Sequence, residues 1–224
     1  MVRSGVLAVS VLLLGGCLDF DKFGVTIVDS CPAEVPEDIC AIEATNIDPA
    51  TFRADSGSSL NGSSCGDGNS CIRVTATAGE RSDVRSRTAG AISGACSAAV
   101  RIFEPTSDAW SLLTLTTDEE GTEDADLASR VEIAFRPGKV RYTAGDQSKE
   151  ADIDETAMVD GLRIRWLDGA AAFDVLAGSE AVGCFTLEGV DLDGSIRVGV
   201  GLDATNDSFD GSTSTKFDDY GFVP

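Results

Sequence analysis

Short stretches in which apolar and polar residues alternate are the feature that most restricts how this chain can fold. Within residues 130–136, Val131, Ile133 and Phe135 would share one face of a strand. Pro137-Gly138-Lys139 has the residue types of a turn, so 130–143 is predicted to be a hairpin. Further strands are predicted at residues 72–77, 99–103, 111–117, 162–166, 171–176, 196–202 and 216–223.

These segments indicate the fold class. They recur about every eight to twelve residues, bounded by Gly, Asp and Asn, and helical periodicity is nearly absent. We therefore predict an all-β protein, an antiparallel two-sheet β-sandwich or jelly roll. Residues 57–70, rich in Gly, Ser and Asn, are predicted to be a loop. No repeat or second linker is visible, so residues 31–224 are assigned to a single domain.

Charge and composition exclude several functions. The 224 residues include 17 basic and 38 acidic side chains, a net charge of -21, and no histidine. A strongly acidic surface repels phosphate backbones, so nucleic acid is excluded as a partner. Without imidazole the chain cannot build a Ser-His-Asp triad or a histidine-ligated zinc site.

The amino terminus predicts export. Arg3 precedes an apolar stretch at 6–14, which is too short to span a membrane but has the length of a signal peptide. Leu14-Gly15-Gly16-Cys17 resembles the lipobox of bacterial lipoproteins, whose cysteine is acylated and becomes the first residue. The alternative is an ordinary secretory signal in which Cys17 is incidental.

The lipobox resemblance implies a domain plan and a location. Residues 1–16 would be the signal peptide, and 17–30 the lipidated Cys17 with a short tether and first strand. Acyl chains such as palmitate would then hold the protein in the bacterial cell envelope. Leu18 follows the cysteine, whereas Asp at that position favours the inner membrane, so we expect the outer membrane.

The remaining cysteines also agree with an oxidising compartment. They are even in number, which predicts three disulfides rather than a metal site, since no Cys-x-x-Cys pair is present. We predict two local pairs, Cys31–Cys40 and Cys65–Cys71, and one long-range pair, Cys96–Cys184.

The carboxy-terminal half resembles a known superfamily. Leu162-Arg163-Ile164-Arg165, then 197–202 (RVGVGL) and the final 216–224 (KFDDYGFVP), look like the closing strands of concanavalin A-like lectin and glucanase jelly rolls. The resemblance covers about residues 70–224. It implies a sandwich of two sheets, one of them concave, with a frequent but not universal role in binding glycans.

Sugar-binding grooves use aromatic faces, which makes Trp110, Tyr142 and Tyr220 the candidate ligand-binding residues. Trp166 shares a face with Leu162 and Ile164, so we expect it in the core.

One group of carboxylates suggests catalysis. Residues 150–155 (EADIDE) resemble the Glu-x-Asp-x-x-Glu motif of laminarinase-like glycoside hydrolases. The resemblance implies Glu150 as nucleophile, Asp152 as assisting acid and Glu155 as acid/base, with the two glutamates about 5 Å apart. However, Ala151 and Asp154 depart from the motif, which counts against an enzyme.

Calcium is the one cofactor that the sequence allows. Asp203, Asp207, Asp218 and Asp219 could supply the hard oxygen ligands that it requires. The acidic run at 118–126 is an alternative, although such runs are commonly solvated loops.

We therefore expect a membrane-anchored exported lipoprotein whose lectin-like β-sandwich binds an envelope or extracellular partner such as a glycan. The alternatives are a structural envelope protein without a small ligand, and a glycoside hydrolase acting through Glu150 and Glu155.

Overall fold

The computed structural model describes only part of the chain, and in this part every regular element is a β-strand. None of the described residues form a helix that could cross a membrane. The described residues are 27–28, 35–36, 40, 47, 49–55, 58–65, 70–91, 95–117, 130–145, 147–167, 170–178, 180–188, 192 and 195–218.

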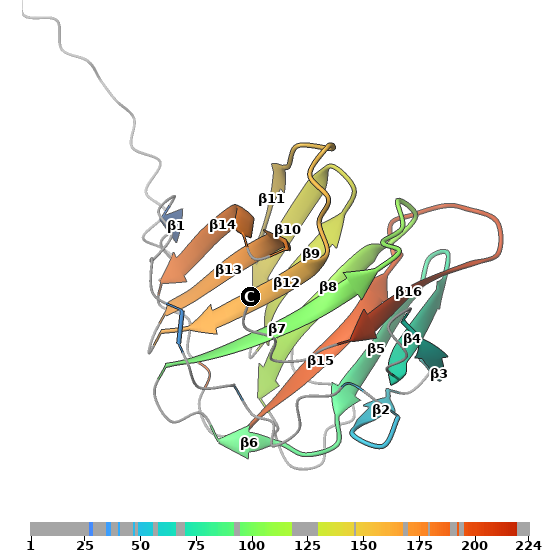
Figure 1. Ribbon diagram of the computed structural model, residues 1–224, viewed down its shortest axis with the longest axis horizontal. Helices are drawn as coiled ribbons and strands as arrows, with labels where there is room; N and C mark the ends of the chain where they lie inside the picture. The colour runs from blue at the N-terminus through green and yellow to red at the C-terminus, as the bar shows by residue number, and fades with distance from the viewer. Residues whose placement is uncertain are drawn as a thin grey trace, which may run out of the picture.

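Two antiparallel sheets lie face to face (Figure 1). The first sheet, called sheet A, has the order β1-β14-β13-β12-β7-β16-β4-β3. Its strands are, in chain order, β1 (Ile27–Val28), β3 (Ser59–Ser64), β4 (Ser70–Thr77), β7 (Cys96–Phe103), β12 (Gly161–Trp166), β13 (Ala170–Ala177), β14 (Glu180–Glu188) and β16 (Ser212–Asp218).

The second sheet, called sheet B, has the order β11-β10-β9-β8-β15-β5-β2, and β6 pairs with one end of β15. Its strands are β2 (Phe52–Ala54), β5 (Arg81–Ser86), β6 (Gly90–Ala91), β8 (Trp110–Thr117), β9 (Arg130–Arg136), β10 (Lys139–Ala144), β11 (Gln147–Asp152) and β15 (Ser195–Asp203). Every strand pairing in both sheets is antiparallel, and neighbours in a sheet often come from distant parts of the sequence. The structure is thus the all-β, two-sheet sandwich that the alternating segments predict.

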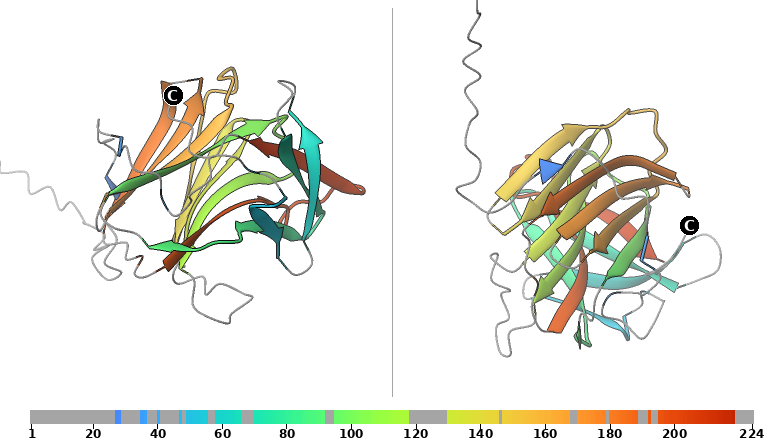
Figure 2. Two further views of the ribbon diagram at one scale, coloured as in Figure 1. Left: turned by 60° about the horizontal axis from the view of Figure 1, so that its bottom comes forward. Right: turned by 90° about the vertical axis from the view of Figure 1, so that its left-hand side faces the viewer.

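Figure 2 shows the two sheets as separate layers, and the hydrophobic core lies between them. From sheet B, Leu113, Ile133 and Val200 point inwards, and from sheet A, Ile164 and Phe173 meet them; all five are fully buried. Trp166 is 5% exposed and belongs to the same cluster, as expected. Alternate residues of each strand face outwards, and these outward faces carry the polar side chains discussed below.

Each predicted strand overlaps an observed one, but the sequence did not predict six others in full. Residues 57–70, expected to be a loop, contain the exposed edge strand β3. Strand β11, at Gln147–Asp152, was not predicted, and neither were β2, β5, β6 and β14. β3 and β11 lie at sheet edges, where one side has no neighbour and alternation is weakly selected.

The disulfides correct one part of the predicted pairing. Cys65 and Cys71 are bonded, as expected. Cys40 is bonded to Cys96 across 56 residues, so the predicted pairs Cys31–Cys40 and Cys96–Cys184 are wrong. Cys184 is also in a disulfide, and Cys31 lies outside the described residues. The physical reason is that β7 brings Cys96 beside residue 40, whose backbone N–H donates to the Ser97 carbonyl.

Candidate functional site

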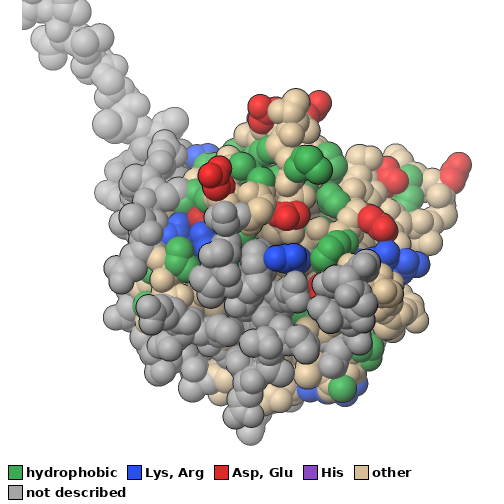
Figure 3. All heavy atoms as spheres, viewed as in Figure 1, with side chains coloured by type: hydrophobic (Ala, Val, Ile, Leu, Met, Phe, Trp, Pro, Cys, Tyr) green, Lys and Arg blue, Asp and Glu red, His purple; other side chains and the backbone are tan. Residues whose placement is uncertain are grey.

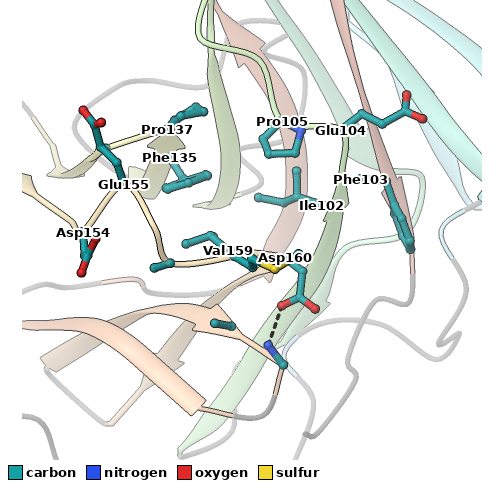
Figure 4. Close-up of a pocket in the computed structure, with 15 residues that line it drawn as sticks. Ile102, Phe103, Glu104, Pro105, Phe135, Pro137, Asp154, Glu155, Val159 and Asp160 are labelled. Carbon is teal, nitrogen blue, oxygen red and sulfur yellow. Dashed lines mark hydrogen bonds between the residues drawn. The ribbon is translucent and has the colours of Figure 1, made fainter.

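An open groove of about 660 Å³ lies at one end of the sandwich (Figure 4). Its walls come from the segment after β7, the β9–β10 turn, the link from β11 to β12 and the end of β13. These four segments are distant in sequence and meet because β9 and β12 lie in opposite sheets with their ends at the same side. The groove is therefore formed only by the folded sandwich.

The floor of the groove is apolar. Ile102 and Phe135 are buried, and Val159 is 8% exposed between them. Pro105 and Pro137 form the upper walls in Figure 4. Met158, at the rim, is 86% exposed, the larger of the two exposed hydrophobic side chains found in the described part of the chain. Such a surface can accept the apolar face of a ligand.

Four carboxylates surround this floor: Glu104, Asp154, Glu155 and Asp160. Asp154 Oδ1 accepts hydrogen bonds from the Thr156 N–H and hydroxyl, which lower the pKa of this carboxyl. Asp160 Oδ1 accepts a hydrogen bond from the backbone N–H of Gly178, 2.8 Å away. No arginine or lysine is among the residues that line the groove.

The carboxylates of Glu104 and Glu155 differ in the contacts that they make. Glu104 is the one non-glycine residue with a positive φ, 58°, in the described chain, and its carboxylate lies 3.2 Å from the Lys216 ammonium. Glu155 forms no hydrogen bond or ion pair with any described residue, and its side chain lies over Gly138 in the β9–β10 turn. In Figure 4, Glu155 and Glu104 stand on opposite sides of the groove.

A second polar constellation covers the outward face of sheet B. Arg81 donates to Asp83 (2.6 Å) and to Glu132 (2.7 Å). Arg141 donates to Asp203 (2.5 Å) and lies 3.6 Å from Glu132, and Arg130 also pairs with Glu132. We call these three arginines and three acids the sheet B network; its formal charges cancel.

Burial and pairing act in opposite directions on the pKa values of this network. Burial raises the pKa of Glu132, although Arg81 and Arg141 oppose the shift, and it raises the pKa of Asp83 against Arg81. Burial acts the same way on Asp203, but hydrogen bonds from Thr205 and Arg141 outweigh it and hold its pKa below the usual value. Asp203 therefore stays ionised to the lowest pH of the three.

Two glycines make room for the sheet B network. Gly199 and Gly201 occupy the outward positions of β15, between β5 and β8. A Cβ at Gly199 would lie 2.4 Å from Thr114 Oγ1, and one at Gly201 would lie 2.6 Å from the Ser82 carbonyl oxygen. The missing side chains leave room for Arg81 of β5 to reach across β15 and β8 to Glu132 of β9.

The structure does not offer the expected aromatic residues to a ligand. Trp110 is 4% exposed on the outward face of sheet B, and the guanidinium groups of Arg136 and Arg141 lie over its ring at 4.4 and 4.8 Å. Tyr142 is 1% exposed in the core and stacks on Phe185. Tyr220 lies outside the described residues.

The expected catalytic carboxylates do not share one cleft. Glu150 and Asp152 are exposed on the edge strand β11, on the same face as their cross-strand neighbours Arg141 and Lys139. Glu155 lies beyond the strand and lines the groove, whereas Glu150 and Asp152 do not. The strand ends at Asp152, so it does not carry all three side chains to one place as the motif requires.

The expected calcium ligands are also separated. Asp203 ends β15 in sheet B and is paired with Arg141, while Asp207 accepts from Arg136 at 3.1 Å. Asp218 is buried at the end of β16 in sheet A. Asp219 and the run 118–126 lie outside the described residues, and among those described no group of acids or cysteines could hold a metal.

Comparison with solved structures identifies the fold. The exoplasmic/lumenal domain of VIP36, solved in a Ca²⁺/Man3GlcNAc-bound form, matches with a TM-score of 0.53 at 12% identity, over 81% of this chain and 88% of that one. A prokaryotic β-1,3-1,4-glucanase (lichenase) from a mouse hindgut metagenome matches with a TM-score of 0.51 at 14% identity, over 77% and 92%.

The legume lectin-like domain from Entamoeba histolytica has a TM-score of 0.50 at 11% identity, over 76% of this chain and 88% of that one. The fold is a concanavalin A-like jelly roll. At these identities the likeness extends to the fold alone. No family model and no curated protein matches the sequence.

Sequence reasoning named Asp154 and Glu155 only as part of a hydrolase-like motif and did not find the groove. Met158 and Asp160 had no signal of their own, because single residues between strands resemble any loop. A weak signal was available in Phe103-Glu104-Pro105, where an acid follows an aromatic residue at the end of a predicted strand.

Proposed function

We propose that this protein is a glycan-binding, lectin-like domain and that the groove at the end of the sandwich is its binding site. The observation that carries this proposal is the combination of an apolar floor with carboxylates on the rim. A pyranose ring has an apolar C–H face and a set of hydroxyl donors at its edge. The floor can contact the first, and the carboxylate oxygens can accept hydrogen bonds from the second.

The fold supports the proposal. Matching structures include a domain solved with Ca²⁺ and Man3GlcNAc and a glucanase. A fold alone does not determine function, so the groove rather than the fold is the basis of the argument. Binding is favoured over hydrolysis because Glu150 and Asp152 lie outside the groove that contains Glu155.

A glycan array with the purified domain tests binding, and a substitution in the groove tests its location. Ala177 and Ala170 are partly exposed at opposite ends of β13, and only Ala177 lines the groove. We expect Ala177→Trp to fill the groove and weaken binding at least tenfold, while the matched control Ala170→Trp leaves it unchanged. Equal loss in both folded variants would refute the location, and no binding at millimolar sugar would refute the lectin function.

Calcium is tested in the same assay. Running the array with calcium and with a chelator shows whether binding needs the ion. If removing calcium abolishes binding, the acids outside the described ion pairs of Asp203 and Asp207 are the first candidates for its ligands. The acids at 118–126 and Asp219 would then be substituted first.

We further propose that Cys17 is lipidated and anchors the domain in the cell envelope, at the outer membrane. The Leu14-Gly15-Gly16-Cys17 motif and the disulfides of the domain support an exported location. Cys17→Ser should release the protein from the membrane fraction. A variant that still partitions with membranes would contradict the anchor, whatever the result of the glycan assays.

A further inference from the structure

We infer that the groove is selective for glycans that carry free amino groups, so that its ligands are amino sugars in their protonated form. This inference rests on the proposed glycan-binding function and adds the chemical class of the ligand. It is carried by charge complementarity between an ammonium-bearing sugar and a groove whose lining holds acids but no base.

The charge of the groove differs from that of the other polar surface. On sheet B each acid of the network lies against an arginine, and the charges cancel. Around the groove, only Glu104 has a cationic partner, the partly buried Lys216. Asp154, Glu155 and Asp160 form no ion pair with any described residue. Three carboxylates at the rim of the groove therefore have no cationic partner among the described residues.

The carboxylates are also placed to accept new donors. Asp154 uses Oδ1 for Thr156 and Asp160 uses Oδ1 for Gly178, and neither Oδ2 has a hydrogen-bond partner among described residues. Glu155 has both oxygens available. In Figure 4 the carboxylates of Asp154 and Glu155 lie at one side of the apolar floor and that of Asp160 at another. An oligosaccharide lying across the floor could thus present amines to at least two of them.

The same features disfavour the other common classes of glycan. Uronic acids and sulfated sugars would bring anions toward the unpaired carboxylates, in a chain whose net charge is already -21. An N-acetylated sugar keeps the apolar contact but loses the ion pairs. Figure 3 shows acidic and hydrophobic side chains close together on the upper part of the face that it displays.

The expected size of the preference for amino sugars follows from the strength of exposed ion pairs. Such pairs contribute about 0.2–1 kcal/mol each, or roughly a 1.5- to 5-fold change in affinity. With two contacts, we expect a glucosamine trisaccharide to bind about tenfold more tightly than its N-acetylated counterpart at low ionic strength. At about 0.5 M salt the preference should fall to about twofold, since screening acts on exposed charges.

The experiment is calorimetric titration of the intact domain with the glucosamine trisaccharide, the N-acetylglucosamine trisaccharide and a lysine tripeptide, at a pH where the amines are protonated. Glu155→Gln is the test variant. Glu150→Gln is the matched control, because it removes the same charge from an exposed position outside the groove. We expect Glu155→Gln to reduce the preference for the amino sugar about threefold and Glu150→Gln to leave it unchanged.

The other outcomes separate the two proposals. Equal or tighter binding of the N-acetylated sugar would overturn the amino-sugar inference and leave glycan binding standing. An equal loss in Glu150→Gln, or equally tight binding of the lysine tripeptide, would show general cation attraction and overturn it as well. If no sugar binds to the protein in this assay or on the array, both the inference and the proposed function fail.

Discussion

Replacing Gly199 by alanine should destabilise the protein, against the usual effect of this substitution in a strand. Gly199 does not have a positive φ, so alanine meets no backbone strain there. Gly→Ala at such a position normally stabilises a protein by about 0.4–1 kcal/mol, because it restricts the unfolded chain. At Gly199, however, the new Cβ would lie 2.4 Å from Thr114 Oγ1, about 1 Å inside ordinary contact.

The overlap cannot be relieved by a flexible side chain. Thr114 is β-branched and 3% exposed, and its strand β8 is held by β9 on one side and β15 on the other. Overpacking of this kind costs about 1–3 kcal/mol. After subtracting the entropic gain, we expect Gly199→Ala to lower the free energy of unfolding by about 1–2 kcal/mol.

A double-mutant cycle tests this reasoning. Thr114→Ala removes the clashing hydroxyl, so adding Gly199→Ala to it should stabilise the protein by about 0.4–1 kcal/mol, which gives a coupling energy of about 2 kcal/mol. Gly62→Ala in β3 is the matched control, because its Cβ would meet only Pro49 Cγ at 3.6 Å. Urea unfolding followed by tryptophan fluorescence measures the four proteins of the cycle and the control. The reasoning is refuted if Gly199→Ala is as stable as the parent, or if it costs the same with and without Thr114.

Two further predictions concern the disulfides and the sheet B network. Cys40→Ala/Cys96→Ala should lower the free energy of unfolding by about 4 kcal/mol and Cys65→Ala/Cys71→Ala by about 2 kcal/mol. The stabilisation by a disulfide grows with the length of the loop that it closes, and the bonded cysteines are 56 residues apart in the first pair and 6 in the second. A larger loss for the short loop in chemical denaturation would contradict this. Asp203→Asn should cost about 1–2 kcal/mol at neutral pH. Because the folded pKa of Asp203 is depressed, its stabilisation is present above its usual value of 3.8 and is lost as the pH falls through the folded pKa. Unfolding curves of parent and variant should therefore converge in acid, and a constant difference would refute the linkage.

The sequence predicted the sandwich because period-two alternation is imposed by burial of one strand face. Val131, Ile133 and Phe135 are all in the core, and the hairpin they begin is present. The alternation of apolar and polar residues is weak in strands that are buried on both faces and in strands that are exposed on both. β8 is buried along nearly its whole length, with Leu112 on the outward face, and exposed β3 has almost no apolar residue.

The site was less predictable, because a groove depends on which loops the topology brings together. The spacing of Glu150, Asp152 and Glu155 suggested a single catalytic strand, but β11 ends at Asp152 and the chain turns. Tyr142 was named for its chemistry, yet its place opposite Lys149 and beside Phe185 puts it in the core. Long-range pairings such as Cys40–Cys96 leave no local pattern in the sequence at all.

The distribution of arginine explains why the acids of the groove are mostly unpaired while those on the sheets have cationic partners. Seven arginines of the described chain form ion pairs with acids, and all seven lie on the strands of the two sheets. Burying these carboxylates without a partner would cost several kcal/mol each, so the scarce bases are needed there. With 17 basic residues against 38 acidic ones, the loops at the end of the sandwich keep mostly unpaired acids. A groove in those loops is consequently acidic, and the ligands that it can select by charge are cations.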